Sequence, residues 1–167
     1  MKNAVYCIAT SEPQANEILT HLRNVNFSAS EISVLLKDKD TRNISVKEDA
    51  IRGAEKGSLA GGILGALAGL TVLTVPVLGP LVVAGPILSA LGGAAVGGVV
   101  GGLAGGSGAL TRIGISENDC SRVEHKLQSG GILIAVHSVD PLRLDRALRV
   151  FKAAGADEVC DLGDIAA

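Results

Sequence analysis

Aromatic residues are scarce in this 167-residue chain, which has no tryptophan, one tyrosine and two phenylalanines. All three, Tyr6, Phe27 and Phe151, lie outside the long apolar stretch in the middle of the sequence. Proteins that hold single-stranded nucleic acid stack bases on aromatic side chains and attract phosphate with basic surfaces, whereas the formal net charge here is −2. The sequence therefore predicts no nucleic-acid partner.

Cysteines are few and widely spaced. Cys7, Cys120 and Cys160 are an odd number, which does not form a closed disulfide framework, so a reducing compartment is the simpler interpretation. The N-terminal segment MKNAVYCIATSEPQ has no apolar region long enough for a signal peptide. We therefore expect the N-terminus to stay in the cytoplasm.

Motifs for catalysis and metal binding are missing from the sequence. C-x-x-C, H-x-x-x-H and G-x-S-x-G do not occur, and GGSGAL at 105–110 lacks the spacing of a phosphate-binding loop. Cys7 and Cys160 on neighbouring strands, with His137 ending another, could form a metal or thiol site. A cysteine in an apolar strand is more often a small buried hydrophobe. The sequence predicts no catalytic residue, no metal site and no cofactor, and thus no enzyme.

Charged residues are absent from Gly57 through Thr111, a run of 55 residues. A helix needs about 20 apolar residues to cross a bilayer, so this run is long enough for two crossings but not three. Two rows of glycines at a spacing of four run through it: Gly57, Gly61, Gly65 and Gly69, then Gly93, Gly97, Gly101 and Gly105. Between the rows, VPVLGP at 75–80 contains Pro76, Gly79 and Pro80, which favour a turn.

The glycine rows predict two closely packed helices. Glycine costs about 0.5–1 kcal/mol relative to alanine in a helix in water, but a bilayer enforces helicity, and rows of small residues let two backbones approach closely. We expect a glycine-zippered hairpin over residues 47–112, with two membrane-spanning or membrane-embedded helices, that also joins copies of the chain into a homo-oligomer. A hairpin buried inside a soluble oligomer and a hairpin lying in one leaflet are the alternatives to a spanning one.

Basic residues flank the apolar run on both sides, with Lys56 before it and Arg112 after it. By the positive-inside rule, both flanks lie in the cytoplasm. These two residues, together with a row on a later expected helix, Arg143, Arg146 and Arg149, are candidates for contact with anionic lipid headgroups. A solvated helix face explains the row of arginines more simply.

The two ends of the chain have the periodicity of alternating strands and helices. Residues 1–46 contain an expected strand from Asn3 to Thr10, an amphipathic helix opened by Ser11 with Gln14 in capping-box position, and a strand from Glu31 to Lys37. Residues 113–167 contain a short helix after Ser116, a strand at 132–137, a helix capped by Asp140 and Pro141, and a strand at 158–162.

Without the insertion and the short helix that follows it, this order is β-α-β followed by β-α-β, which is ferredoxin-like. The sequence predicts an α+β fold in which a ferredoxin-like sheet domain is interrupted between its second and third strands by a glycine-rich transmembrane helical hairpin. The first and third strands are the most apolar and are expected to be central, with the second and fourth at the edges.

Several segments resemble a known family. GSLAGGILGALAGL, VPVLGPLVVAGPI, GGAAVGGVVGGLAG and GISENDCSRVEHKLQSGGILIAVHS occur in the order found in the bacterial heat-induced and low-temperature-induced general stress proteins. The resemblance covers nearly the whole chain and implies stress-linked expression and membrane association, with no catalytic residues. In architecture the chain is also similar to a small membrane subunit of the quinol-oxidising alternative complex III.

These observations predict a non-enzymatic general stress protein of the bacterial inner membrane, with both termini in the cytoplasm. Its α+β domain would support assembly or bind a protein partner whose identity the sequence does not indicate, while its hairpin binds the lipid bilayer and self-associates. The alternatives are an oligomeric pore, a small membrane subunit of a larger complex such as a respiratory one, a ligand-sensing domain, and a soluble cytoplasmic oligomer.

Overall fold

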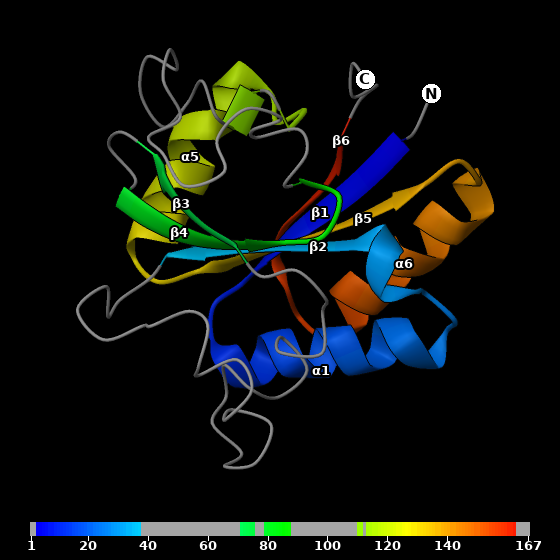
Figure 1. Ribbon diagram of the computed structural model, residues 1–167. Helices are drawn as coiled ribbons and strands as arrows, with labels where there is room; N and C mark the ends of the chain where they lie inside the picture. Colours follow the sequence, from blue (N-terminus) through cyan, green and yellow to red (C-terminus); the bar gives the residue numbers. More distant parts are fainter. Residues whose placement is uncertain (1–2, 38–70, 76–78, 88–109, 112, 163–167) are drawn as a thin grey trace.

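The computed structural model describes residues 3–37, 71–75, 79–87, 110–111 and 113–162. These ranges form an α+β structure built on one six-stranded sheet with helices on both faces (Figure 1). The strand order is β3-β4-β2-β5-β1-β6, and every neighbouring pair is antiparallel.

The N-terminal part contains β1 (Asn3–Ala9), α1 (Glu12–Asn24), a short 3-10 turn η1 (Ala29–Glu31) and β2 (Ile32–Lys37). At the start of α1, the hydroxyl of Ser11 accepts a hydrogen bond from the Gln14 amide at 3.4 Å. The Gln14 side chain in turn accepts one from the Thr10 amide at 2.8 Å. The apolar residues expected to share one face of α1 are buried: Ala15, Ile18, Leu19 and Leu22.

The C-terminal part contains α5 (Glu117–Gln128), β5 (Ile132–Ser138), α6 (Pro141–Ala153) and β6 (Asp157–Leu162). Helix α6 begins as predicted, because the Asp140 carboxylate accepts a hydrogen bond of 2.9 Å from the Leu142 amide. A glycine follows the end of each of these helices in the left-handed region, with φ of 96° at Gly130 after α5 and 65° at Gly155 after α6.

The middle of the apolar run is β structure rather than helix. Strands β3 (Thr71–Val75) and β4 (Gly79–Ala84) form an antiparallel hairpin, and β4 pairs with β2. The predictions that these residues belong to two helices, and that β2 lies at an edge of the sheet, are therefore wrong. Without β4, strand β2 would expose an unpaired row of backbone groups. The apolar residues of GPLVVA suit the strand that pairs with β2, and the β-branched residues of TVLTV suit the strand that pairs with β4 in turn.

The residues of the turn predicted at 75–80 include the end of β3 and the start of β4. Gly79 and Pro80 are the first two residues of β4 and lie opposite Val75 and Thr74 of β3, while Pro76 lies outside the described residues. A proline is tolerated at the start of a strand, where its missing N–H interrupts few ladder hydrogen bonds.

Apolar side chains are buried on both faces of the sheet. Helices α1 and α6 cover one face, and α5 covers the other (Figure 1). Successive residues of a strand point to opposite faces, so Val5 packs on the α1 side while Tyr6 packs on the α5 side. This two-sided burial explains why β1 and β5 are apolar at nearly every position.

Candidate functional site

The eight glycines of the two rows lie outside the described residues, as do Lys56 and Arg112. Within the described ranges, no helix is both long enough and apolar enough to span a membrane. The described residues do include those on either side of the glycine-rich segments 38–70 and 88–109. These are Lys37 and Thr71 in the sheet, and Ile87 and Leu110 in the core on the α5 side.

A buried hydrogen bond fixes the chain just before segment 88–109. The amide of Ile87 donates to the hydroxyl of Ser33 on β2 at 2.9 Å, and the same hydroxyl lies 2.9 Å from Nε2 of His137. Ser33 is fully buried, so this polar group has its partners inside the protein. Ile87 and Leu110 are both buried in the core on the α5 side, which fixes the chain at both ends of the segment.

Gly85 permits the close approach that this bond requires. Its φ of 85° is in the left-handed region, and a Cβ atom at this position would lie 2.1 Å from the carbonyl oxygen of Ile32. A side chain here would push β4 away from β2. Gly85 stands eight residues before Gly93, so it continues the spacing of four through Ser89, and that spacing gives no sign of its left-handed conformation.

A second cluster lies where α5 meets the edge strand β6. Glu158 of β6 has a φ of 48°, which is unusual for a residue other than glycine, and it lies at an irregularity in the pairing of β6 with β1. Its carboxylate lies 3.1 Å from Nε of Arg122 and 3.3 Å from Nζ of Lys126, both on α5. Strain of this kind persists only where surrounding contacts hold the residue in place.

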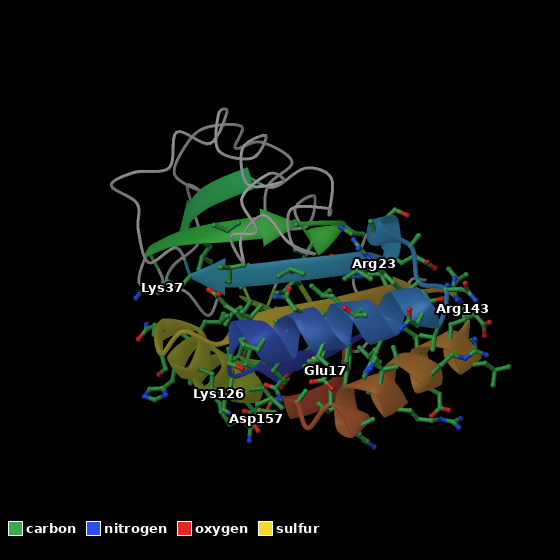
Figure 2. All side chains as sticks on the ribbon, turned by 90° about the horizontal axis from the view of Figure 1, so that it is seen from below. Glu17, Arg23, Lys37, Lys126, Arg143 and Asp157 are labelled. Atoms are coloured by element: carbon green, nitrogen blue, oxygen red, sulfur yellow. The ribbon has the colours of Figure 1, made fainter. Side chains whose placement is uncertain are left out.

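Lys126 also binds Asp157, and the two side chains lie together well away from Arg143 (Figure 2). The hydrogen bond to Asp157 raises the pKa of Lys126 and that to Glu158 adds to it, although burial acts in the opposite direction. Arg122 additionally pairs with Asp119 one turn earlier on α5. The cluster thus contains three carboxylates, those of Asp119, Asp157 and Glu158, and two cations, those of Arg122 and Lys126.

Tyr6 and Cys160 lie next to this ionic cluster. They are paired residues of β1 and β6, and Tyr6 is only 1% exposed. The Tyr6 hydroxyl lies next to the Cys160 thiol, but it makes no hydrogen bond of normal geometry with any described residue. Burial raises the pKa of Tyr6, and Cys160 and the nearby Asp119 and Glu158 raise it further, so the phenol keeps its proton.

The structure does not bring Cys7, Cys160 and His137 together. Cys7 points into the core beneath α1 and α6, whereas Cys160 packs against the core on the α5 side. His137 lies beside Ser33. Burial raises the pKa of Cys7, which keeps its thiol protonated. The described part of the chain contains no group of three or more side chains suited to hold a metal ion.

The three arginines of α6 have different surroundings. Arg143 forms a two-pronged ion pair with Glu31, donates to the carbonyl of Asn26 at 2.8 Å and lies over the ring of Phe27 at 4.7 Å. Its guanidinium thus joins α6 to the loop that precedes β2. Arg149 pairs with Asp145, and Arg146 and Arg149 line an open hollow of about 330 Å³ between α1 and α6.

Helix α6 lies on the sheet face opposite the core that holds Ile87 and Leu110. Arg143, Arg146 and Arg149 are thus on a helix on the other side of the sheet from the two ends of segment 88–109.

Comparison with known proteins found no matching family model, curated protein or solved structure. The assignment of the described residues to the α+β class therefore rests on their own helices and strands. The sequence contains a signal for the α5–β6 cluster, because Arg122 and Lys126 stand four positions apart and Asp157 and Glu158 are adjacent acids. It contains no signal that α5 and β6 meet.

Proposed function

We propose that this chain is a non-enzymatic, membrane-associated general stress protein whose α+β domain is an assembly module. In this proposal the sheet holds the glycine-rich segments 38–70 and 88–109 at both of their ends, and these segments contact a bilayer and other copies of the chain. The observation that carries the proposal is the pairing of β4 with β2, since it builds the middle of the uncharged run into the sheet between the two segments.

The strand arrangement supports a ferredoxin-like domain. Strands β6-β1-β5-β2 follow one another in antiparallel pairs, with α1 and α6 on one face. In this assignment β3 and β4 extend the sheet beyond β2, and α5 covers its second face. The domain would then be assembled from both ends of the chain, 1–46 and 113–167, with the hairpin at 71–84 added from its middle.

The positions of β3 and β4 limit how the chain can meet a bilayer. Lys37 and Thr71 belong to one sheet, and Ile87 and Leu110 to one core, so each glycine-rich segment begins and ends on the same side of a membrane. An even number of crossings would need about 40 apolar residues per segment. Residues 88–109 number 22, and the uncharged residues 57–70 number 14. We therefore propose that the two segments insert into the cytoplasmic leaflet without crossing the bilayer. This is the membrane-embedded alternative to the spanning helices predicted from the sequence.

Membrane association is tested by cell fractionation without detergent. We expect the full-length protein in the membrane fraction, and its recovery in the soluble fraction would contradict the proposal. A protease site introduced at 76–78 separates the two membrane geometries. Insertion into one leaflet predicts cleavage only from the cytoplasmic side, whereas cleavage from the opposite side would show a spanning hairpin. The same site at the C-terminus is the control for cytoplasmic access.

Self-association through the glycine rows is tested by Gly65→Leu and Gly97→Leu, with Ile63→Leu as a control outside the rows. Leucine increases apolar area and helix propensity, so a simple anchor predicts unchanged or better membrane retention. Close packing between backbones predicts oligomers weakened by roughly 1–3 kcal/mol in the two glycine variants. Crosslinking and size analysis in detergent measure this difference. Parent-like behaviour of all three variants would contradict packing through the rows.

A further inference from the structure

We propose that Cys160 is a peroxide-sensitive thiol and that Tyr6 is a positioning residue whose hydroxyl stabilises the oxidised form. This modification site is separate from the glycine-rich segments and does not depend on membrane association. The proposal starts from the buried hydroxyl of Tyr6, which lies beside the Cys160 thiol and has no hydrogen-bond partner among the described residues.

A buried hydroxyl without a partner is unfavourable, because folding removes it from water without replacing its hydrogen bonds. The neighbouring sulfur is a weak acceptor and compensates little of that loss. An oxygen atom attached to the same sulfur would be a much better acceptor at the same place. Oxidation of Cys160 would therefore give Tyr6 a partner that none of the described residues provides in the reduced protein.

The reaction is oxidation by a hydroperoxide, for which hydrogen peroxide is the simplest case. The Cys160 thiol loses its proton, and the thiolate sulfur attacks one peroxide oxygen. The S–O bond forms as the O–O bond breaks, and the departing hydroxide takes up a proton to become water. The sulfur loses two electrons, the peroxide gains two, and the product is a sulfenic acid.

The surroundings of Tyr6 suit a hydrogen-bond donor. Burial and the nearby carboxylates of Asp119 and Glu158 hold the pKa of the phenol above its usual value, so its O–H remains intact at neutral pH. Arg122 and Lys126 pair with these carboxylates, which limits the negative charge next to Cys160.

The other two cysteines provide internal controls. Cys7 and Cys120 are fully buried, whereas Cys160 is half-buried on the edge strand β6. The Cys120 thiol donates to the carbonyl of Ile115 at 3.6 Å, and burial raises the pKa of Cys7. Because the thiolate is the reactive form and the peroxide must reach it, oxidation is expected at Cys160 in preference to the other two.

The first experiment treats the full-length protein with hydrogen peroxide, traps sulfenic acid with dimedone and locates the adduct by peptide mass spectrometry. We expect labelling at Cys160 and little at Cys7 or Cys120, with the Cys160 signal lost in Cys160→Ser. Equal labelling of the three cysteines, or none at Cys160, would overturn the proposal.

The role of Tyr6 is tested with Tyr6→Phe, which keeps the ring and removes the hydroxyl. Loss of a hydrogen bond to the oxidised sulfur predicts about tenfold less sulfenic acid retained after a fixed time, with correspondingly more sulfinic acid. The thermal midpoint of the variant shows whether it folds like the parent. If it does, and it retains as much sulfenic acid as the parent, the hydroxyl plays no part in stabilising the oxidised form, as expected if it binds only water.

A spectroscopic measurement on the unsubstituted protein covers the case in which Tyr6→Phe does not fold. Tyr6 is the single tyrosine, and the chain has no tryptophan, so its near-ultraviolet absorption is free of overlap with other tyrosines or tryptophan. Peroxide treatment should shift this absorption in the parent and leave it unchanged in Cys160→Ser. An identical spectrum before and after stoichiometric oxidation of Cys160 would contradict a new hydrogen bond to Tyr6.

Discussion

The amide of Ile87 donates a buried hydrogen bond of 2.9 Å to the hydroxyl of Ser33, a residue 54 positions earlier in the chain. This bond joins the end of the central apolar hairpin to β2, next to the point where segment 88–109 begins. It connects the proposed assembly function to the stability of the sheet, because a change at Ser33 alters how firmly that segment is held.

Ser33→Ala removes the acceptor and leaves the Ile87 amide buried without its partner. We expect the free energy of unfolding to fall by about 1–3 kcal/mol, the usual loss for an unsatisfied buried group. Urea unfolding of the full-length protein measures it. Ser129→Ala is the matched control, since Ser129 is exposed and its hydroxyl donates to the His125 carbonyl of its own helix. An equal loss in both variants would show that the buried bond has no special role.

Gly85→Ala should destabilise the protein more than Gly155→Ala. Both glycines have positive φ, so a side chain at either one introduces backbone strain of about 1–2 kcal/mol. At Gly85 the added Cβ also meets the Ile32 carbonyl oxygen at 2.1 Å, while at Gly155 it meets nothing within 4 Å. Thermal midpoints of the two variants give the comparison. Equal midpoints would exclude a close approach of β4 to β2 at Gly85.

Glu158→Gly should be more stable than Glu158→Ala. Both changes remove the ion pairs with Arg122 and Lys126, so the difference reports on the backbone alone. Glycine tolerates the φ of 48° without strain, which should outweigh its greater flexibility in the unfolded chain by roughly 0.5–1 kcal/mol. Urea midpoints decide the order. Greater stability of the alanine variant would mean that residue 158 does not adopt this conformation.

The ion pair of Glu31 with Arg143 predicts a pH dependence of stability. Burial would raise the pKa of Glu31, but hydrogen bonds from Ser28 and from Arg143 outweigh burial and lower it. A carboxyl group whose pKa is lower in the folded state stabilises the protein above its unfolded pKa, which is about 4.3 for glutamate. This contribution is lost as the pH falls through the folded value.

The variant Glu31→Gln removes that contribution. We expect its deficit in the free energy of unfolding to be largest above about pH 5 and to shrink as the pH falls below about 4.3. Urea unfolding of both proteins across this range provides the test, and the other carboxylates cancel in the difference. A deficit that stays constant or grows in acid would contradict the lowered pKa.

The sequence alone predicted the local structure of both ends of the chain. Ser11 and Asp140 cap their helices as expected, and the helix faces are buried as the spacing of their apolar residues indicates. Such features depend on hydrogen bonds and contacts between residues at most four positions apart, which a single sequence displays directly. The apolar character of β1 and β5 likewise indicated strands with neighbours on both sides.

The central hairpin was not predictable in this way. Short apolar segments such as TVLTV and GPLVVA occur in helices and in strands, and the choice between them is made by the pairing of β4 with the open edge of β2 and of β3 with β4. The opposite orientations of Cys7 and Cys160 depend likewise on strand register and on which helix covers which face.

What the sequence by itself determined is the set of helices and strands at the two ends, the uncharged run and the spacing of its glycines. Only the tertiary structure decided that β4 completes the sheet at β2, that Ser33 holds Ile87, and that Tyr6 lies against Cys160. The physical reason is that each of these contacts joins residues more than 40 positions apart, and the spacing of residues along one chain carries no information about which distant residues will be adjacent.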